Sequence, residues 1–286
     1  MQTTLRMLAQ RVAALEQRVA ALEQAAAPEA TIDTALRRRG WAIAGRSGTD
    51  RLLLPRSAEP AAVDGYYAHL RHYHFRRLLQ ELVEQRTLTP AAVRRLEERW
   101  GARAVGRTFD RLAAYGLLVR RPEGLRLATA HVRAFGDTLE WFVAQVFLRE
   151  FAAPAAWDVR IRRVRKGGDF DVLVLLDGRL GYVECKASPP YNVSADVLAG
   201  FLERVRGLAP DFTILVIDTT LLVDRNIIDN LTRLLQEAGV PPPVTRAAPG
   251  VYQMGRGVPL FVVTSRRSLV ANLALCLRRL HGAREE

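Results

Sequence analysis

Four charged side chains flank the dipeptide Asp177-Gly178. Asp169 and Asp171 precede it, and Glu184 and Lys186 follow it. Carboxylates on neighbouring strands offer the oxygen ligands that divalent cations prefer, and a lysine beside them can stabilise negative charge. Such residues act together only if the two segments around the dipeptide are adjacent strands in the right register.

Lys186 is unusual because the chain contains only two lysines, Lys166 and Lys186, among 42 Lys and Arg residues. Arginine carries a broad guanidinium with a fixed charge, whereas lysine is a compact ammonium on a flexible stem. A site that requires one ammonium close to a carboxylate would favour lysine. Chance is the alternative explanation.

An Asp-Gly dipeptide, as at 177–178, is preferred in two-residue hairpin turns. Counting outward from such a turn, Asp171 falls opposite Glu184, and Asp169 falls opposite Lys186. Side chains alternate along a strand, so all four are expected on one face. Two facing carboxylates repel unless a cation lies between them. The pattern predicts a metal site, provided that the turn has two residues; Asp169 could instead only form an ion pair with Lys186.

The cofactor expected at such a site is Mg²⁺ or Mn²⁺, because Mg²⁺ is held by one or two carboxylates and keeps water and substrate phosphate in its other positions. The ion can lower the pKa of a bound water and stabilise the charge that develops on a phosphodiester. Lys186 would hold or polarise the attacking water. A buried ion-pair network without catalytic function is the alternative for the same residues.

Residues 135–240 resemble the PD-(D/E)xK nucleases, which have the restriction-endonuclease-like fold. The motif that carries the resemblance is Asp171 followed by Glu184-Cys185-Lys186, within the family's order of helix, hairpin, helix, strand and helix. Phe170 stands in place of the proline in the family's name. The resemblance implies a mixed-sheet domain with metal-dependent phosphodiesterase activity.

The resemblance also implies roles for individual residues. Asp171 and Glu184 would be metal ligands, and the backbone carbonyl of Cys185 would be a further ligand. Lys186 would be the catalytic lysine. Glu140, on the helix before the hairpin, would be the acidic residue that many members place beside the metal.

The order of elements predicts an α/β fold, or α+β for the chain as a whole. After residue 135, strands alternate with amphipathic helices, which is typical of an α/β layer. The sheet must be mixed because its central pair is a hairpin. Beyond residue 240, a proline-rich loop, a hairpin and a final helix complete a predicted domain of residues 133–286.

Residues 64–132 resemble a winged helix-turn-helix domain. One long helix is expected over 63–85, a second begins at Thr89-Pro90, and a third ends at Gly116. A hairpin around 122–124 would be the wing.

Arginines recur along the third helix and the hairpin. Arg103, Arg107 and Arg111 stand at four-residue steps on one helical face, where they could meet phosphates or base edges. A solvated face or a protein-interaction module would show the same pattern. The predicted nucleic-acid contacts are Arg103, Arg107, Arg111, Arg120, Arg121 and Lys166.

Residues 1–24 are predicted to form a coiled coil. Over residues 5–22, a Leu or Val recurs at alternating steps of three and four residues, and the placing of Val12 and Val19 favours a parallel two-stranded coiled coil and hence a homodimer. The alternative is one amphipathic helix packed on its own chain. Residues 25–63 are expected to be a linker with a short helix and a hairpin that turns at Gly48.

The composition limits the classes of function. The 286 residues, 49% of them hydrophobic, are typical of a globular protein of roughly two domains. No apolar run is long enough for a membrane helix, and two cysteines cannot form a disulfide framework, so we expect a cytoplasmic protein. The net charge of +12 favours a polyanionic partner, although an arginine-rich background would give the same charge. His69, His72 and His74 are expected to pack with aromatic residues rather than bind zinc.

Together these patterns predict a metal-dependent DNA nuclease, and more specifically an endonuclease, that engages DNA through its middle domain. RNA stays open as a substrate. Restriction, phage defence and repair are compatible roles, as is a partner protein that licenses cleavage. The alternative from another class is a winged-helix regulator or scaffold whose nuclease-like domain only binds.

Overall fold

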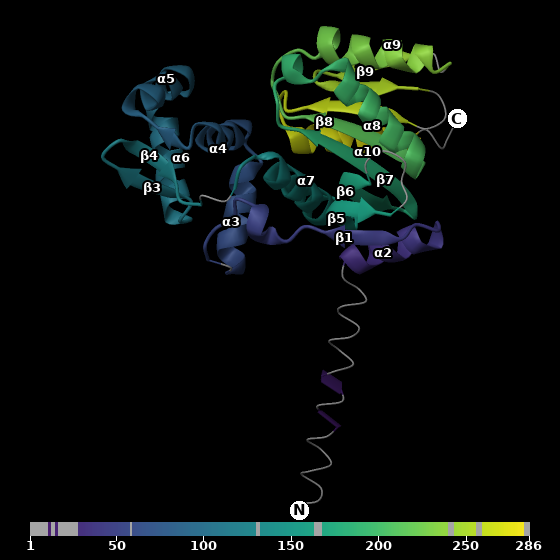
Figure 1. Cartoon of the computed structure of the whole chain (residues 1–286), viewed down its shortest axis with the longest axis horizontal. Coiled ribbons are helices and arrows are strands. Elements are labelled where there is room, and N and C mark those ends of the chain that lie inside the picture. Colours follow the sequence, from purple (N-terminus) through teal and green to yellow (C-terminus); the bar gives the residue numbers. More distant parts are fainter. Residues whose placement is uncertain are drawn as a thin grey trace, which may run out of the picture.

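The computed structural model describes residues 11–12, 15–16, 28–57, 59–129, 132–162, 168–239, 243–255 and 259–282. An eight-stranded mixed sheet of order β1-β5-β6-β7-β8-β11-β10-β9 forms the larger unit (Figure 1). A three-stranded sheet, β2-β4-β3, belongs to a smaller helical unit. Lys166 and most of the predicted coiled coil over 5–22 lie outside the described residues.

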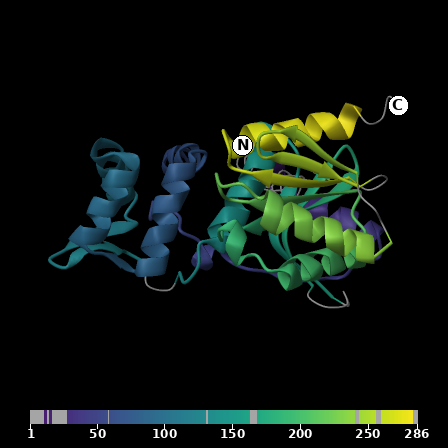
Figure 2. The ribbon, with the colours of Figure 1, turned by 90° about the horizontal axis from the view of Figure 1, so that it is seen from above.

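The large sheet is covered by helices on both faces. Helices α7 (Gly136–Glu150) and α10 (Leu269–Gly282) pack on one face, here called the α7 side. Helices α2 (Pro28–Arg38), α8 (Ala195–Leu208) and α9 (Asp229–Glu237) pack on the other, the α8 side (Figure 2). The strands are β1 (Ile43–Arg46), β5 (Ala155–Ile161), β6 (Asp169–Leu176), β7 (Arg179–Lys186), β8 (Phe212–Ile217), β9 (Val244–Ala248), β10 (Val251–Met254) and β11 (Leu260–Thr264).

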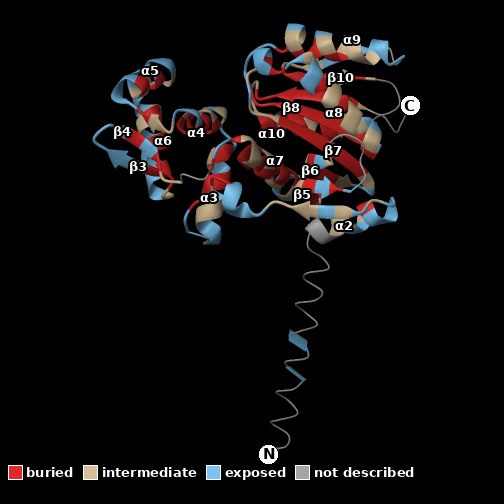
Figure 3. Ribbon diagram, viewed as in Figure 1, coloured by how far each residue is buried: buried red, intermediate tan, exposed pale blue. Residues whose placement is uncertain are grey.

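Strand directions confirm the predicted mixed sheet. β5, β6 and β7 are antiparallel, whereas β7 runs parallel to β8, and β8 runs parallel to β11. Every residue of β8 is buried, and Figure 3 shows the burial continuing into the neighbouring strands. A strand covered on both faces reads as a continuous apolar run, which explains the sequence FTILVI.

The hairpin that carries the acidic residues has the predicted turn and register. Asp177 and Gly178 have φ values of 48° and 75°, and positive φ at both central residues is what a type I′ turn requires. The pairs run from Leu176–Arg179 to Val172–Val183. The turn prediction is therefore confirmed over this part of the hairpin.

Residues 41–55 do not form the local hairpin predicted around Gly48. β1 instead pairs antiparallel with β5 and extends the large sheet, and a 3₁₀ turn, η1 (Thr49–Arg51), follows it. Leu52 and Leu53 are then buried on the α7 side. Burial against the larger unit outweighed the local turn signal. The proline-rich segment after residue 240 also contains a strand that was not predicted, β9.

The smaller unit has the element order helix, strand, helix, helix and hairpin. Its elements are α3 (Pro60–Leu70), α4 (Tyr73–Gln85), β2 (Thr87–Leu88), α5 (Pro90–Trp100), α6 (Ala102–Ala114), β3 (Leu118–Arg121) and β4 (Gly124–Leu127). The single helix predicted over 63–85 is wrong, because the chain breaks at Arg71-His72. The Arg76 guanidinium donates to the Leu70 carbonyl at 2.5 Å and so satisfies the end of α3.

A buried ion pair joins the two units. Arg76 of α4 is 1% exposed, and its Nε and Nη2 donate to the Asp218 carboxylate at 2.8 and 2.6 Å. Asp218 directly follows β8, and its backbone N–H donates to the Lys186 carbonyl at 2.8 Å. The ion pair thereby connects the smaller unit to the ends of β7 and β8. Figure 1 shows α4 on the side of the smaller unit that faces the larger one.

Acidification is expected to destabilise the smaller unit through His69. Its ring packs edge-on against Phe75 and Tyr115, with centroids 5.4 and 6.0 Å apart, and burial, aided by Arg111, lowers the His69 pKa below 6.5. A histidine kept neutral by folding contributes stability above its unfolded-state pKa, and that stability is lost as the pH falls through the folded-state value.

Urea unfolding of the wild type and of His69→Phe between pH 7.5 and 5 tests this. The free energy of unfolding should fall more steeply with acid in the wild type. His281→Phe supplies a control, because His281 lies in the last turn of α10, in the larger unit and away from His69. Equal slopes for wild type and His69→Phe would show that His69 does not carry the effect.

Candidate functional site

Glu184 lies at the centre of a charged cluster on the α8 side of the sheet. Its side chain is buried, and its Oε1 accepts from Lys186 Nζ and from Arg204 Nη2 of α8, each at 2.6 Å. The Tyr182 hydroxyl donates to Oε2 and accepts from Arg204 Nε at 3.0 Å. The two motif residues of β7 that sequence analysis singled out are therefore in direct contact.

Asp171 of β6 adjoins this cluster at an irregular point of the sheet. Its Oδ2 accepts from the Cys185 backbone N–H at 2.8 Å. On β5, Asp158 has a φ of 45°, and the β5–β6 pairing skips it. Phe170 consequently packs on the α8 side although Val172, two residues on, packs on the α7 side. Side-chain alternation thus changes at Asp171.

Asp169 does not belong to the cluster. Its side chain is 74% exposed and lies 3.7 Å from Arg160 Nε, its neighbour on β5. The prediction that Asp169 shares a face with Lys186 was wrong because it assumed unbroken alternation through Asp171. Lys186 takes Glu184 as its partner instead.

Glu140, on α7, adds a carboxylate close to Asp171. Burial, and then the Asp171 charge, raise the pKa of Glu140 to about 9. Burial, and then the Glu184 charge, raise the pKa of Asp171 to about 7. Among the described residues, the Glu140 carboxylate has no hydrogen-bond or ion-pair partner. Lys186 and Arg204 only partly offset these effects at Asp171, so a further cation placed there would be stabilised.

Glu184 and Lys186 differ from Asp171 and Glu140, because each is stabilised in its charged form. Although burial favours the neutral carboxyl, Lys186 and Arg204 hold the pKa of Glu184 below its usual value of 4.5. Burial also disfavours the Lys186 ammonium, but Glu184 and Asp171 raise its pKa above 10.5. Both groups are charged at neutral pH. The site therefore combines an acidic part with a cationic one.

The carboxylates of the site are of the ligand type that hard divalent cations prefer, but those in the described ranges are not gathered around one point. Asp171 engages only Oδ2 with Cys185, and Glu140 is unengaged within the described chain. Both Glu184 oxygens already accept hydrogen bonds, and no group of three potential ligands in the described ranges stands at coordination spacing. Asp171 and Glu140 would thus hold a cation most directly. Glu184 would join once Tyr182 releases Oε2 or once both Lys186 and Arg204 release Oε1.

Sequence analysis missed Arg204, Tyr182 and Asp158. A usable signal existed for Arg204, because it lies one helical turn after Phe201, whose ring faces Tyr182 at 5.9 Å between centroids. Asp158 gave no signal, since its role depends on the irregular β5–β6 pairing. Cys185 lies level with Val216 of β8, and its carbonyl stays a predicted ligand.

The predicted nucleic-acid contacts of the smaller unit lie at its surface. Arg103, Arg107 and Arg111 are all exposed on α6, as the four-residue spacing requires. On the hairpin, Arg120 and Arg121 are both exposed, and Arg120 forms a surface ion pair with Asp110 at 3.1 Å.

Comparisons with known proteins leave the family open. No protein-family model and no curated protein matches the chain. Among solved structures, the protein VC1899 from Vibrio cholerae superposes with a TM-score of 0.38 and 16% identity over 59% of this chain. The match spans 50% of that protein's length. Within the part of the chain that the structure describes, no helix combines the length and apolarity needed to cross a bilayer.

Proposed function

We propose that the protein is a metal-dependent nuclease that hydrolyses phosphodiester bonds in DNA. The observation that carries this proposal is the contact of Lys186 with buried Glu184, 2.6 Å apart, next to Asp171 and the unpaired carboxylate of Glu140. The resemblance of these residues to the PD-(D/E)xK motif, on a mixed sheet, supports a restriction-endonuclease-like domain. Cytoplasmic roles in restriction, defence or repair, and a licensing partner, are compatible with it.

Each residue of the site has a distinct task in this proposal. Asp171, Glu140 and Glu184, with the Cys185 carbonyl, would hold Mg²⁺ or Mn²⁺, which supplies an activated water and charge stabilisation when bound. The Lys186 ammonium is 26% exposed and charged, so it can orient the attacking water and offset charge on the phosphate. Tyr182 helps to fix Glu184, and Glu184 fixes Lys186.

Substrate cleavage is the first test of this function. Plasmid, linear and branched DNA and duplex RNA are incubated with the protein in EDTA, Mg²⁺ or Mn²⁺. Glu184→Gln keeps the shape of the side chain but removes the charge that holds two cations, and we expect it to abolish metal-dependent cutting. Glu237→Gln, at an exposed ion pair on α9, is the matched control and should cut normally.

The outcomes separate the candidate functions. Cutting of RNA but not DNA would overturn the substrate assignment. Binding of DNA without cutting in any metal would favour the alternative, a regulator or scaffold with a catalytically silent domain.

The smaller unit would supply DNA affinity as a winged helix-turn-helix domain. Its order α4, β2, α5, α6 and a β3–β4 hairpin suits that assignment, with α6 as the recognition helix. The predicted coiled coil would bring two such chains together, which suits cleavage of both strands or of a branched junction.

Removal of two arginines from α6 is expected to weaken DNA binding without affecting the cleavage site. Arg107→Ala with Arg111→Ala should lower affinity about tenfold at moderate salt and flatten the salt dependence, because two phosphate contacts and their released counterions are lost. Fluorescence anisotropy over a salt series measures both quantities. Arg233→Ala, exposed on α9, serves as the control; equal effects from both variants would mean that α6 is not the binding face.

A further inference from the structure

Arg204 holds the candidate site from the α8 side through two of its three guanidinium nitrogens. Nη2 lies 2.6 Å from Glu184 Oε1, and Nε lies 3.0 Å from the Tyr182 hydroxyl. The side chain is 21% exposed, so it reaches solvent while Glu184, at 1%, does not. Arg204 therefore lies between the buried carboxylate and the surface.

The third nitrogen, Nη1, is available for another partner. It makes no hydrogen bond to any described residue. Gly200, one turn earlier on α8, leaves the adjoining helix surface bare: a Cβ built there would lie 3.8 Å from Nη1. A glycine inside a helix costs about 1 kcal/mol relative to alanine, and here it keeps the approach to the guanidinium open.

Two cations converge on one oxygen of Glu184. Lys186 and Arg204 both contact Oε1, and the only hydrogen bonds that Arg204 makes within the described chain are those of Nε and Nη2. An arginine that is already fixed by two hydrogen bonds loses little entropy when it binds an anion, and its fork geometry suits phosphate oxygens.

We infer that Arg204 is a second phosphate-binding cation of this site, which uses Nη1 to contact a non-bridging oxygen of the phosphodiester while Nε and Nη2 keep Tyr182 and Glu184 in place. This inference rests on the proposed nuclease function. It adds a substrate-contacting residue that lies on the helix after the motif rather than in it.

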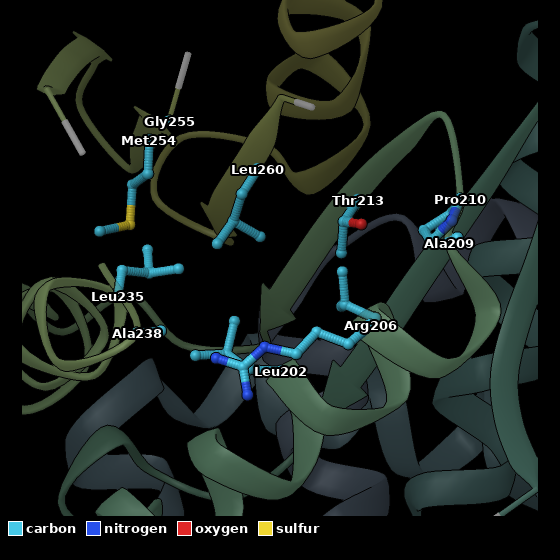
Figure 4. Close-up of a pocket in the computed structure, with 11 residues that line it drawn as sticks. Leu202, Arg206, Ala209, Pro210, Thr213, Leu235, Ala238, Met254, Gly255 and Leu260 are labelled. Carbon is cyan, nitrogen blue, oxygen red and sulfur yellow. The ribbon is translucent and has the colours of Figure 1, made fainter. Parts of the chain in front are cut away.

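Arg206 offers a matched control on the same helix. It is exposed and lines a separate cavity of about 400 Å³ between α8, α9 and the strands β10 and β11, together with Leu202, Met254 and Leu260 (Figure 4). It has no ion-pair partner within the described chain. Arg206→Gln thus removes an equal charge from α8 without touching Glu184.

The test compares Arg204→Gln, Arg204→Lys and Arg206→Gln in three measurements: Mn²⁺ affinity by electron paramagnetic resonance, DNA affinity in Ca²⁺ over a salt series, and single-turnover cleavage in Mg²⁺. Arg204→Gln should lower cleavage about 100-fold and reduce the salt slope of DNA binding by about one. Its Mn²⁺ affinity should stay equal or increase, because a cation next to a ligand is removed. Arg204→Lys should recover part of the cleavage, and Arg206→Gln should resemble the wild type.

Two results would overturn the inference. A parallel loss of Mn²⁺ affinity and cleavage in Arg204→Gln would show that Arg204 only supports Glu184, and an unchanged salt slope would show that it does not contact phosphate. If the wild type cuts no substrate, the proposed function fails, but the DNA-binding measurement still decides whether Arg204 contacts phosphate.

Discussion

Replacing Lys186 with alanine is expected to lower cleavage about 1,000-fold while fold and DNA affinity are retained. The ammonium lies 2.6 Å from Glu184 and is 26% exposed, so it is positioned both to be oriented by the carboxylate and to reach substrate. Its raised pKa, which Glu184 and Asp171 maintain against burial, keeps it charged at neutral pH. Removing it would withdraw that charge from the transition state. Single-turnover cleavage under saturating Mg²⁺ measures the loss directly.

Lys186→Arg is the sharper variant, because it keeps the positive charge. Arg204 already occupies the same Glu184 oxygen, so a second broad guanidinium would have to compete for that position. We expect Lys186→Arg to remain at least 100-fold below the wild type. Wild-type cleavage by Lys186→Ala would remove the lysine from the mechanism, and full activity in Lys186→Arg would show that only charge is required.

The largest loss of stability is expected from Arg76→Ala, which should lower the free energy of unfolding by about 3–5 kcal/mol. Asp218 is 4% exposed and receives two hydrogen bonds from Arg76, so truncation would leave a buried carboxylate without its cation. The Leu70 carbonyl at the end of α3 would lose its donor as well. Urea unfolding followed by circular dichroism measures the change.

Arg71→Ala provides the matched control for Arg76→Ala. Arg71 also pairs across the two units, with Glu150 of α7 at 3.3 Å, but its side chain is 47% exposed. Its loss should cost about 0–1 kcal/mol, because water screens the pair. The double variant Arg76→Met with Asp218→Leu should recover most of the stability, since it removes both charges together. Similar losses from Arg76→Ala and Arg71→Ala would contradict the account.

The hairpin of β6 and β7 could be predicted because its information is local. An Asp-Gly turn fixes the register of the residues next to it, and the observed pairs follow that register as far as Val172–Val183. Beyond that point the prediction for Asp169 was wrong, because the positive φ of Asp158 on a neighbouring strand changes the alternation at Asp171. An irregularity imposed by another strand leaves no mark in the hairpin sequence.

Contacts between segments that are distant in the sequence could not be predicted either. Arg76 and Asp218 are 142 positions apart, and nothing in either local sequence indicates the other. Arg76 also donates to the Leu70 carbonyl at the end of α3, where one continuous helix was predicted. β1 likewise pairs with β5, which is distant in the sequence, rather than with a strand directly after the turn predicted at Gly48. Arg204 lay within reach of sequence reasoning, since helical spacing places it one turn after Phe201.

The most direct test of a metal-dependent site at Asp171 is the cleavage of plasmid DNA by EDTA-treated protein when Mg²⁺ is added back. Wild type and Asp171→Asn are compared side by side, because the amide preserves the shape of the side chain and removes its charge. The account predicts no cutting before Mg²⁺, rapid cutting after it in the wild type, and little in Asp171→Asn. Equal cutting by both proteins, or cutting that persists in EDTA, would contradict it.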